Sequence, residues 1–194
     1  KSFAGVVALK GIDLEIRPGK IYCLMGENGC GKSTLIKIIS GVYAPDQGKI
    51  ELDGKLVKHM TPKEAIKNGI EVIYQDFSVF PNLTVAENIS VNTEITQKRK
   101  AVNWKRIYRQ AQLALDKLGI TLPLDETVER LSVANRQLIA ISRAIAHDAR
   151  LLIMDEPTTA LTKREVDALF AVVKRLNASG ISIIFVSHKL DEVM

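Results

Sequence analysis

The chain has 194 residues, of which 46% are hydrophobic and 25% are charged, which suits a single globular domain with a substantial core. Its net charge of +5 fits an anionic ligand, but the basic residues are dispersed, which argues against a nucleic-acid-binding protein. No apolar run approaches the roughly 20 residues that cross a bilayer, and no signal-peptide pattern opens the chain, so we expect any membrane role to act through a partner.

The first predicted elements are β-structure. Residues 6–16 alternate imperfectly between apolar and polar and lead to the turn signal Pro18-Gly19. The short apolar run at residues 21–25, which includes Cys23, predicts a buried strand. The second cysteine, Cys30, follows seven residues later, and two such cysteines are not a disulfide framework but fit a reducing cytoplasm.

A glycine-rich segment comes next, at residues 26–34, and has the Gly-x-x-x-x-Gly-Lys-Ser pattern of a phosphate-binding loop. Its glycines allow the backbone to fold tightly and to aim N–H groups at phosphate oxygens. Lys32 can reach the β- and γ-phosphates of a nucleotide, and the Ser33 hydroxyl can ligate Mg²⁺. The helix predicted to start here points its positive dipole end at the same phosphates. The candidate nucleotide-binding residues are Gly26, Glu27, Asn28, Gly29, Cys30, Gly31, Lys32, Ser33 and Thr34.

Three short elements are predicted between this loop and the middle of the chain. Residues 49–57 alternate strictly around a central Asp-Gly pair and predict a β-hairpin. Thr61 and Glu64, with a proline between them, predict a capped helix start. Residues 70–74 then predict a strand.

From residue 81 to about 149 the pattern becomes helical. Helices are predicted at residues 84–91, 103–118 and 135–147. Trp104 is expected to anchor its helix rather than to bind a ligand. Three leucines of the same helix are expected in the core: Leu113, Leu115 and Leu118.

After residue 149 the chain returns to strand, helix and strand. The apolar run 151–154 ends in Asp155 and Glu156, and the carboxyl end of a parallel strand faces the ligand crevice of an α/β fold. Asp155 is placed to hold Mg²⁺, and Glu156 is the candidate general base for an attacking water. His188 follows the strand predicted at 181–186 and could contact a γ-phosphate. Thr162 and Glu165 predict a capping box for the intervening helix.

With these motifs in order, the chain resembles the nucleotide-binding subunit of ABC transporters along essentially its whole length. The resemblance implies an α/β P-loop NTPase fold with an antiparallel β segment and a helical subdomain. Within that family the chain is similar to carbohydrate importers of the ribose, galactose and autoinducer-2 type, and looks like the first of two tandem domains. The matching landmarks are Phe3, residues 26–34, Gln75, residues 131–137, Asp155 with Glu156, residues 157–162, and His188.

The resemblance also implies roles for residues outside the phosphate loop. Phe3 would stack on adenine, and Gln75 would sense the γ-phosphate and help to hold Mg²⁺. Ser132 would contact ATP bound to a second domain that meets this one head to tail. His188 would orient the attacking water. The catalytic set is then Lys32, Gln75, Glu156 and His188, with Ser33, Gln75 and Asp155 around the metal.

Two departures from the family pattern bear on activity. Val133 and Ala134 replace the two glycines of the family signature, which makes close backbone approach to a phosphate less easy. Thr162 stands where the family has aspartate at the end of residues 157–162. A catalytically weak, regulatory domain is therefore one alternative, and a soluble ABC-type ATPase with no transport role is another.

The resemblance predicts the domain organisation and the setting. We expect one domain over residues 1–194, truncated at its C-terminus, with a nucleotide-binding core at 1–80 and 150–194 and a helical subdomain at 81–149. The implied cofactors are ATP and Mg²⁺. The implied partners are membrane permease subunits, a second ABC domain in tandem or as a homodimer, and, indirectly, a solute-binding protein, with no nucleic acid. The expected location is the cytoplasmic face of the inner membrane, as a peripheral protein.

Overall fold

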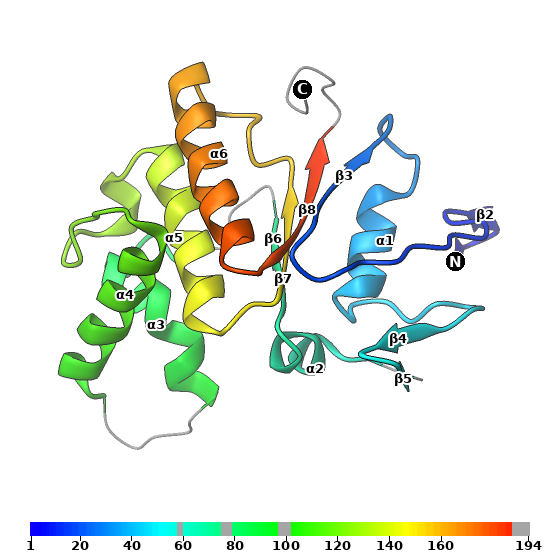
Figure 1. Cartoon of the computed structure of the whole chain (residues 1–194), viewed down its shortest axis with the longest axis horizontal. Helices are drawn as coiled ribbons and strands as arrows, with labels where there is room; N and C mark the ends of the chain where they lie inside the picture. The colour runs from blue at the N-terminus through cyan, green and yellow to red at the C-terminus, as the bar shows by residue number, and fades with distance from the viewer. Residues whose placement is uncertain (58–59, 75–78, 97–101, 188–194) are drawn as a thin grey trace.

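A four-stranded parallel sheet forms the centre of the protein in the computed structural model, which describes residues 1–57, 60–74, 79–96 and 102–187. Its strand order is β3-β8-β7-β6, and each neighbouring pair is parallel (Figure 1). Parallel strands have their carboxyl ends at one edge of the sheet, so the segments that follow β3 and β7 meet there. The strands are β3 (Ile21–Met25), β6 (Ile70–Ile73), β7 (Leu151–Asp155) and β8 (Ser182–Ser187).

Helices cover both faces of this sheet, as a parallel sheet requires. Leu152 and Met154 pack with α5 (Val133–Ala146) and α6 (Lys163–Ala178) on one face. Ile153, with the opposite side-chain direction, packs with Ile36 of α1 (Lys32–Ile39) on the other face. Figure 1 shows α5 and α6 on one side of the strands and α1 on the other. The alternation along β7 therefore fills two separate cores from one strand.

Two short antiparallel pairs lie outside the sheet: β1 (Ser2–Phe3) with β2 (Val6–Val7), and β4 (Ile50–Leu52) with β5 (Lys55–Val57). The predicted hairpin at 49–57 is confirmed, and Asp53 and Gly54 both have positive φ in its turn. The alternation over 6–16 gives a strand only at its start.

Predicted helix starts are confirmed by their hydrogen bonds. In α2 (Pro62–Lys67), the Thr61 hydroxyl accepts from the Glu64 amide, and a Glu64 carboxylate oxygen accepts from the Thr61 amide at 2.8 Å. In α6, a Glu165 carboxylate oxygen accepts from the Thr162 amide at 2.9 Å. Each bond satisfies a backbone group that a helix end would otherwise leave unpaired.

The middle of the chain forms a helical group with its own core. It consists of α3 (Val85–Thr96), α4 (Trp104–Leu118), the 3₁₀ turn η1 (Val128–Arg130) and α5, and fully buried Ile89, Leu115 and Val128 lie between these elements. Figure 1 shows α3 and α4 beyond α5, away from the sheet. These elements fall within residues 81–149, for which a helical subdomain stays a prediction.

One prediction on α4 is wrong, and the expected anchor Trp104 is largely exposed. Leu115 and Leu118 are buried as expected, but Leu113 is 52% exposed and Trp104 is 54% exposed. Successive helical residues are turned by about 100°, so Leu113 lies roughly 200° from Leu115, on the solvent side. Trp104 is the first residue of the helix and lies outside its buried stripe.

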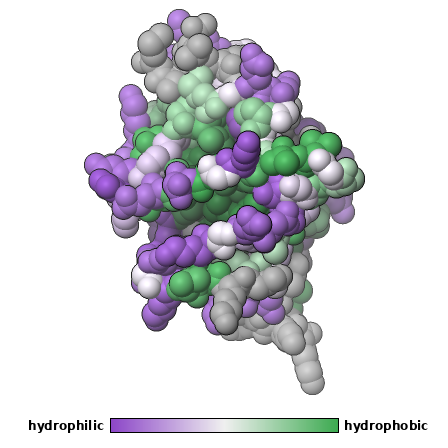
Figure 2. All heavy atoms as spheres, turned by 90° about the vertical axis from the view of Figure 1, so that its right-hand side faces the viewer, coloured by the Kyte–Doolittle hydropathy of each residue, from purple (hydrophilic) through white to green (hydrophobic). Residues whose placement is uncertain are grey.

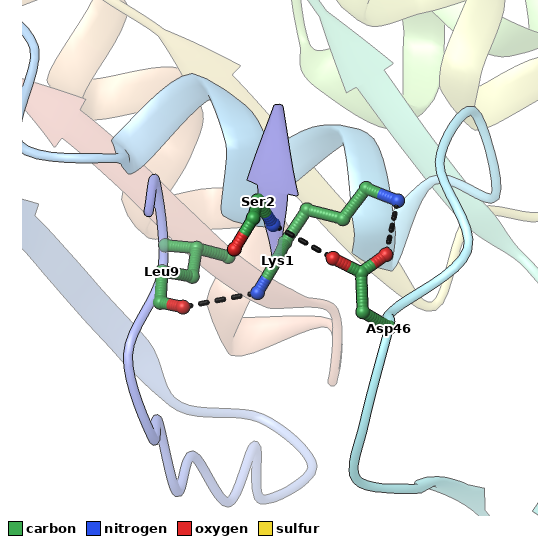
Figure 3. Close-up of polar contacts among 4 residues, drawn as sticks. All are labelled: Lys1, Ser2, Leu9 and Asp46. Atoms are coloured by element: carbon green, nitrogen blue, oxygen red, sulfur yellow. Dashed lines mark hydrogen bonds and ion pairs between the residues drawn. The ribbon is translucent and has the colours of Figure 1, made fainter. Parts of the chain in front are cut away.

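The start of the chain is held against the loop that follows α1. The side-chain ammonium of Lys1 and the backbone amide of Ser2 both donate to the Asp46 carboxylate, at 2.6 and 2.7 Å. The N-terminal amino group of Lys1 donates to the Leu9 carbonyl (Figure 3). The bond from Lys1, followed by that from Ser2, lowers the pKa of Asp46. These contacts fix the β1–β2 hairpin against the loop that follows α1.

The outer edge of β3 is exposed, which corrects the prediction of a buried strand there. Cys23 is exposed because β3 pairs with β8 on one side only among the described strands. An apolar hollow of about 80 Å³ lies beside this edge, lined by residues that include Leu14, Cys23 and Leu35. Figure 2, which looks at the side of the molecule that carries α1 and the β1–β2 hairpin, shows apolar surface between hydrophilic side chains.

Candidate functional site

The predicted phosphate-binding loop connects β3 directly to α1, in the arrangement of strand, loop and helix that the sequence indicated. Gly31, immediately before the helix, has a φ of 97°. A Cβ at this position would lie 2.5 Å from the Ala8 carbonyl oxygen and 2.7 Å from the Leu9 side chain. Glycine is therefore required here both by backbone conformation and by the close approach of residues 8 and 9.

Lys32 is folded back over its own loop. Its side chain is largely buried, and its ammonium donates to the Gly26 carbonyl at 2.5 Å and to the Glu27 carbonyl at 2.9 Å. The Cys30 sulfur lies 3.8 Å from the same nitrogen. The lysine thus ties the two ends of the loop together and holds a positive charge beside the helix N-terminus, where the helix dipole adds to its field.

A cavity of about 170 Å³ joins the loop to the end of β7. Because β3, β8 and β7 are parallel and adjacent, residues about 125 positions apart in the sequence meet at this edge of the sheet. The cavity is lined by Ala8, Asn28, Gly29, Gly31, Lys32, Ser33, Thr34, Asp155 and Glu156. Sequence reasoning proposed all of these except Ala8, whose position depends on a contact that no local pattern indicates.

The two carboxylates of the cavity repel each other. Burial raises the pKa of Asp155, and the neighbouring charge of Glu156 raises it further, while Lys32 and Lys37 oppose the shift. Such a carboxylate is costly to keep ionised unless a further cation joins it. Together with the Ser33 hydroxyl, Asp155 offers the hard oxygen donors that Mg²⁺ prefers, so the residues fit that ion. Among described residues, no group of three or more His, Cys, Asp or Glu forms an additional metal site.

The raised pKa of Asp155 predicts a pH-dependent gain in stability for Asp155→Asn. When the pKa of a carboxyl is higher in the folded protein than in the unfolded chain, its ionisation destabilises the fold. The free energy of unfolding therefore falls as the pH rises through the folded-state pKa. The variant without nucleotide should therefore melt at a higher temperature than wild type at neutral pH. The difference should shrink as the solution is acidified and wild-type Asp155 becomes protonated.

Thermal unfolding of both proteins over a pH series measures this effect. Asp167→Asn, at an exposed position on α6, is the matched control and should show no comparable gain. A variant Asp155→Asn that melts below wild type at neutral pH would show that ionised Asp155 stabilises the fold instead.

Glu156 has a backbone conformation that non-glycine residues rarely adopt. Its φ is 49°, in the left-handed region, and its amide donates to the Val186 carbonyl at 3.0 Å. The Thr159 hydroxyl donates to the Glu156 carbonyl at 3.3 Å. Left-handed backbone costs a non-glycine residue about 1–2 kcal/mol, and such strain concentrates at functional sites. The turn holds the carboxylate at the cavity, immediately after Asp155.

Several proposed site residues do not line the cavity: Gly26, Glu27 and Cys30 of the loop itself, and Ser132 and Phe3 elsewhere. Ser132 is exposed and caps α5, where its hydroxyl accepts from the Asn135 amide at 3.3 Å. Phe3 is 39% exposed and its ring lies 5.1 Å from that of Tyr43 at an interplanar angle of 60°. The remaining two, Gln75 and His188, fall outside the described residues.

Comparison with known proteins agrees with this geometry. The family model described as ABC transporter matches residues 9–159. A ribose import ATP-binding protein of Rubrobacter xylanophilus is 48% identical over 193 residues, which are 100% of this chain and 38% of that protein. A putative ribose/galactose/methyl galactoside import ATP-binding protein of Agrobacterium fabrum is 42% identical over 193 residues, again 100% of this chain and 38% of its own length.

Solved structures show the same fold. A nucleotide-free ATP-binding cassette from an ABC transporter has a TM-score of 0.87 at 27% identity, with 100% of this chain and 80% of that chain covered. A dimeric cassette in a post-hydrolysis state, bound to ADP and Pi, has a TM-score of 0.80 at 26% identity, covering 99% and 85%. The described helices include none that is long and apolar enough to cross a membrane.

Proposed function

This chain belongs to the ABC transporter family as an ATP-binding domain, and on that basis we propose that it hydrolyses ATP to power import of a sugar or sugar-like solute through a membrane permease. The observation that carries the proposal is the cavity that joins the phosphate loop to Asp155 and Glu156. It combines a cationic, amide-rich wall with an anionic wall, which is what a nucleotide triphosphate with a divalent ion requires.

The loop wall binds the phosphates. Lys32 supplies a fixed positive charge, and the amides at the start of α1 add the positive end of the helix dipole. Because Lys32 already holds two loop carbonyls, the loop has its shape before nucleotide arrives. Binding then loses little conformational entropy in the loop.

The carboxylate wall serves the metal and the water. Ser33 and Asp155 would hold Mg²⁺, which when bound neutralises charge on the β- and γ-phosphates. Glu156, at the same cavity, accepts the proton of the attacking water as general base. Gln75 and His188 are proposed, from the family resemblance, to sense the γ-phosphate and to orient the water.

Ser132 is proposed to act on the nucleotide of a second domain. Its exposed position at the N-terminal end of α5, outside the cavity of its own chain, supports contact across a head-to-tail dimer. Val133 and Ala134, half-buried in the first turn of α5, replace the glycines of the family signature. Their Cβ atoms favour the helix but limit how closely a phosphate can approach. The face offered to the partner is therefore the weaker half of a shared site.

The importer assignment rests on the relatives. The chain spans less than two fifths of the length of these relatives. We propose permease subunits and a second ABC domain as direct partners, a solute-binding protein as an indirect one, and the cytoplasmic face of the inner membrane as the location. The dispersed basic residues give no support for a nucleic-acid partner.

One experiment tests this function against its alternatives. ATP hydrolysis is measured for the natural full-length protein alone and reconstituted with its permease in vesicles, with uptake of labelled ribose and galactose measured in parallel. Coupled hydrolysis and uptake are expected. Binding of ATP without hydrolysis would favour the regulatory alternative, for which Val133 and Ala134 are the specific observation. Hydrolysis that no permease stimulates would favour a soluble ATPase.

Cys30 provides a direct test of where the nucleotide lies. Its sulfur is exposed beside Lys32, so a bound phosphate chain should shield it, and alkylation by iodoacetamide should slow at least tenfold in the presence of Mg²⁺ and ATP. Mass spectrometry of the two cysteine peptides measures the rates. Cys23, exposed on the far edge of β3, is the internal control and should react equally fast in both conditions. Equal protection of both thiols, or of neither, contradicts the placement.

A further inference from the structure

A buried polar pair joins the helical group to the sheet at a distance from the cavity. The Nδ1 atom of His147 lies 3.0 Å from a Glu71 carboxylate oxygen, and the two side chains are only 9% and 13% exposed. Glu71 belongs to the outer strand β6, and His147 is the residue at which α5 ends. Neither residue lines the nucleotide cavity, so the proposed chemistry does not account for the pair.

The surroundings of this pair include a third polar side chain. Arg143, one turn earlier on α5, is partly buried, which lowers its pKa, while the charge of Glu71 opposes that shift. In this contact the carboxylate oxygen of Glu71 is the acceptor, so the Nδ1 atom of His147 is the matching donor. The other ring nitrogen, Nε2, is buried and has no hydrogen-bond partner in the described structure. The bond to Glu71 therefore fixes the orientation of the ring.

The pair lies at the opposite end of α5 from Ser132, so a change in the tilt of the helix there would move Ser132. Helix α5 runs from the Ser132 cap to His147 and is 14 residues long, which corresponds to about 21 Å. A tilt of about 5° at the His147 end would move the Ser132 end by roughly 2 Å, and misplacement of about 1 Å can cost 10²-fold in rate. At the Ser132 end the polar bonds are local, because Arg136 donates to the Leu131 and Glu129 carbonyls at 3.1 and 2.8 Å. The buried amide of Gln137, one residue further on, has no hydrogen-bond partner within the described ranges.

We propose that Glu71 and His147 are positioning residues. Their hydrogen bond fixes the C-terminal end of α5 on β6 and so sets where Ser132 is presented to the partner domain. The inference rests on the proposed function, because it assigns the consequence to the site that two domains share. The inference predicts different effects on two properties. Nucleotide binding within one chain does not involve α5 and should be unaffected, whereas turnover needs Ser132 in place and should fall.

The test uses the natural full-length protein with its partner subunits. His147→Leu removes the donor, whereas His147→Asn keeps an N–H close to the position of Nδ1. His147→Leu is expected to lower kcat about 10- to 100-fold while the Kd for ATP changes less than about twofold. His147→Asn should recover most of the lost kcat. Asp148→Asn, at the exposed neighbouring position, is the matched control and should behave as wild type.

Each other result has a defined meaning. Unchanged kcat in His147→Leu, an equal loss in His147→Asn, or a parallel loss of ATP affinity overturns the positioning role. If His147→Leu does not fold, Glu71→Asp tests the same bond by withdrawing the carboxylate by one methylene, with the same expected split between kcat and Kd. A wild-type protein that does not hydrolyse ATP contradicts the proposed function itself, whereas active wild type with fully active variants contradicts only this inference.

Discussion

Glu156→Gln is expected to lower ATP hydrolysis by about 10²- to 10⁴-fold, the usual contribution of a general base, while ATP remains bound. Glutamine has the shape of glutamate and can keep its place at the cavity, but its amide cannot accept a proton from water. Phosphate binding depends on the opposite wall, where Lys32 and the loop amides lie. The change should also remove a charge that repels the nucleotide, so affinity should hold or rise.

Single-turnover hydrolysis and equilibrium binding of ATP, measured on the same preparation, separate these two effects. Glu15→Gln is a suitable control, because the exposed carboxylate of Glu15 pairs with Arg17 and does not line the cavity. Its turnover should be close to that of wild type. Full turnover in Glu156→Gln would show that another group takes the proton from water.

The second large effect is expected at Lys32. Lys32→Met keeps the length of the side chain but removes the charge, and a hydrogen bond to a charged group contributes about 1.5–3 kcal/mol. The Kd for ATP should rise about 10- to 100-fold from this loss alone. A further loss is expected because the carbonyls of Gly26 and Glu27 lose their shared donor, so the empty loop is less ordered.

Titration with a fluorescent ATP analogue measures this change. Lys37→Met is the matched control, since Lys37 lies on the same helix and its ammonium lies over the Tyr43 ring, 5.5 Å from the centroid. Its effect on affinity should be a few-fold at most. Similar losses in both variants would mean that Lys32 contributes only to the general positive potential.

Sequence patterns predicted the features that depend on neighbouring residues. The hairpin turn at Asp53 and Gly54, the capping bonds of Thr61 and Thr162, and the junction of strand, loop and helix at the phosphate loop all follow from local backbone preferences. Once the strands were recognised as parallel, the meeting of that loop with Asp155 and Glu156 also followed, because parallel strands end at one edge.

Features set by distant contacts could not be predicted in this way. Cys23 lies in an apolar run, but its exposure depends on which strands flank β3. Gly31 was expected to be glycine for its loop, whereas its contact with the Ala8 carbonyl comes from a segment 23 positions earlier. The pairing of Glu71 with His147 depends on how α5 lies on β6, which neither periodicity nor motif spacing determines.

The left-handed backbone of Glu156 has a consequence for how copies of this domain diverge. Glycine at this position would relieve about 1 kcal/mol of backbone strain. It would also remove the negative charge that raises the pKa of Asp155. Loss of the proposed base would therefore make the fold more stable. A duplicated domain freed from the need to hydrolyse ATP would drift readily toward glycine or asparagine there. Return to glutamate would require stability gained elsewhere first. Loss of the carboxylate at this position is therefore easier for the fold than its return.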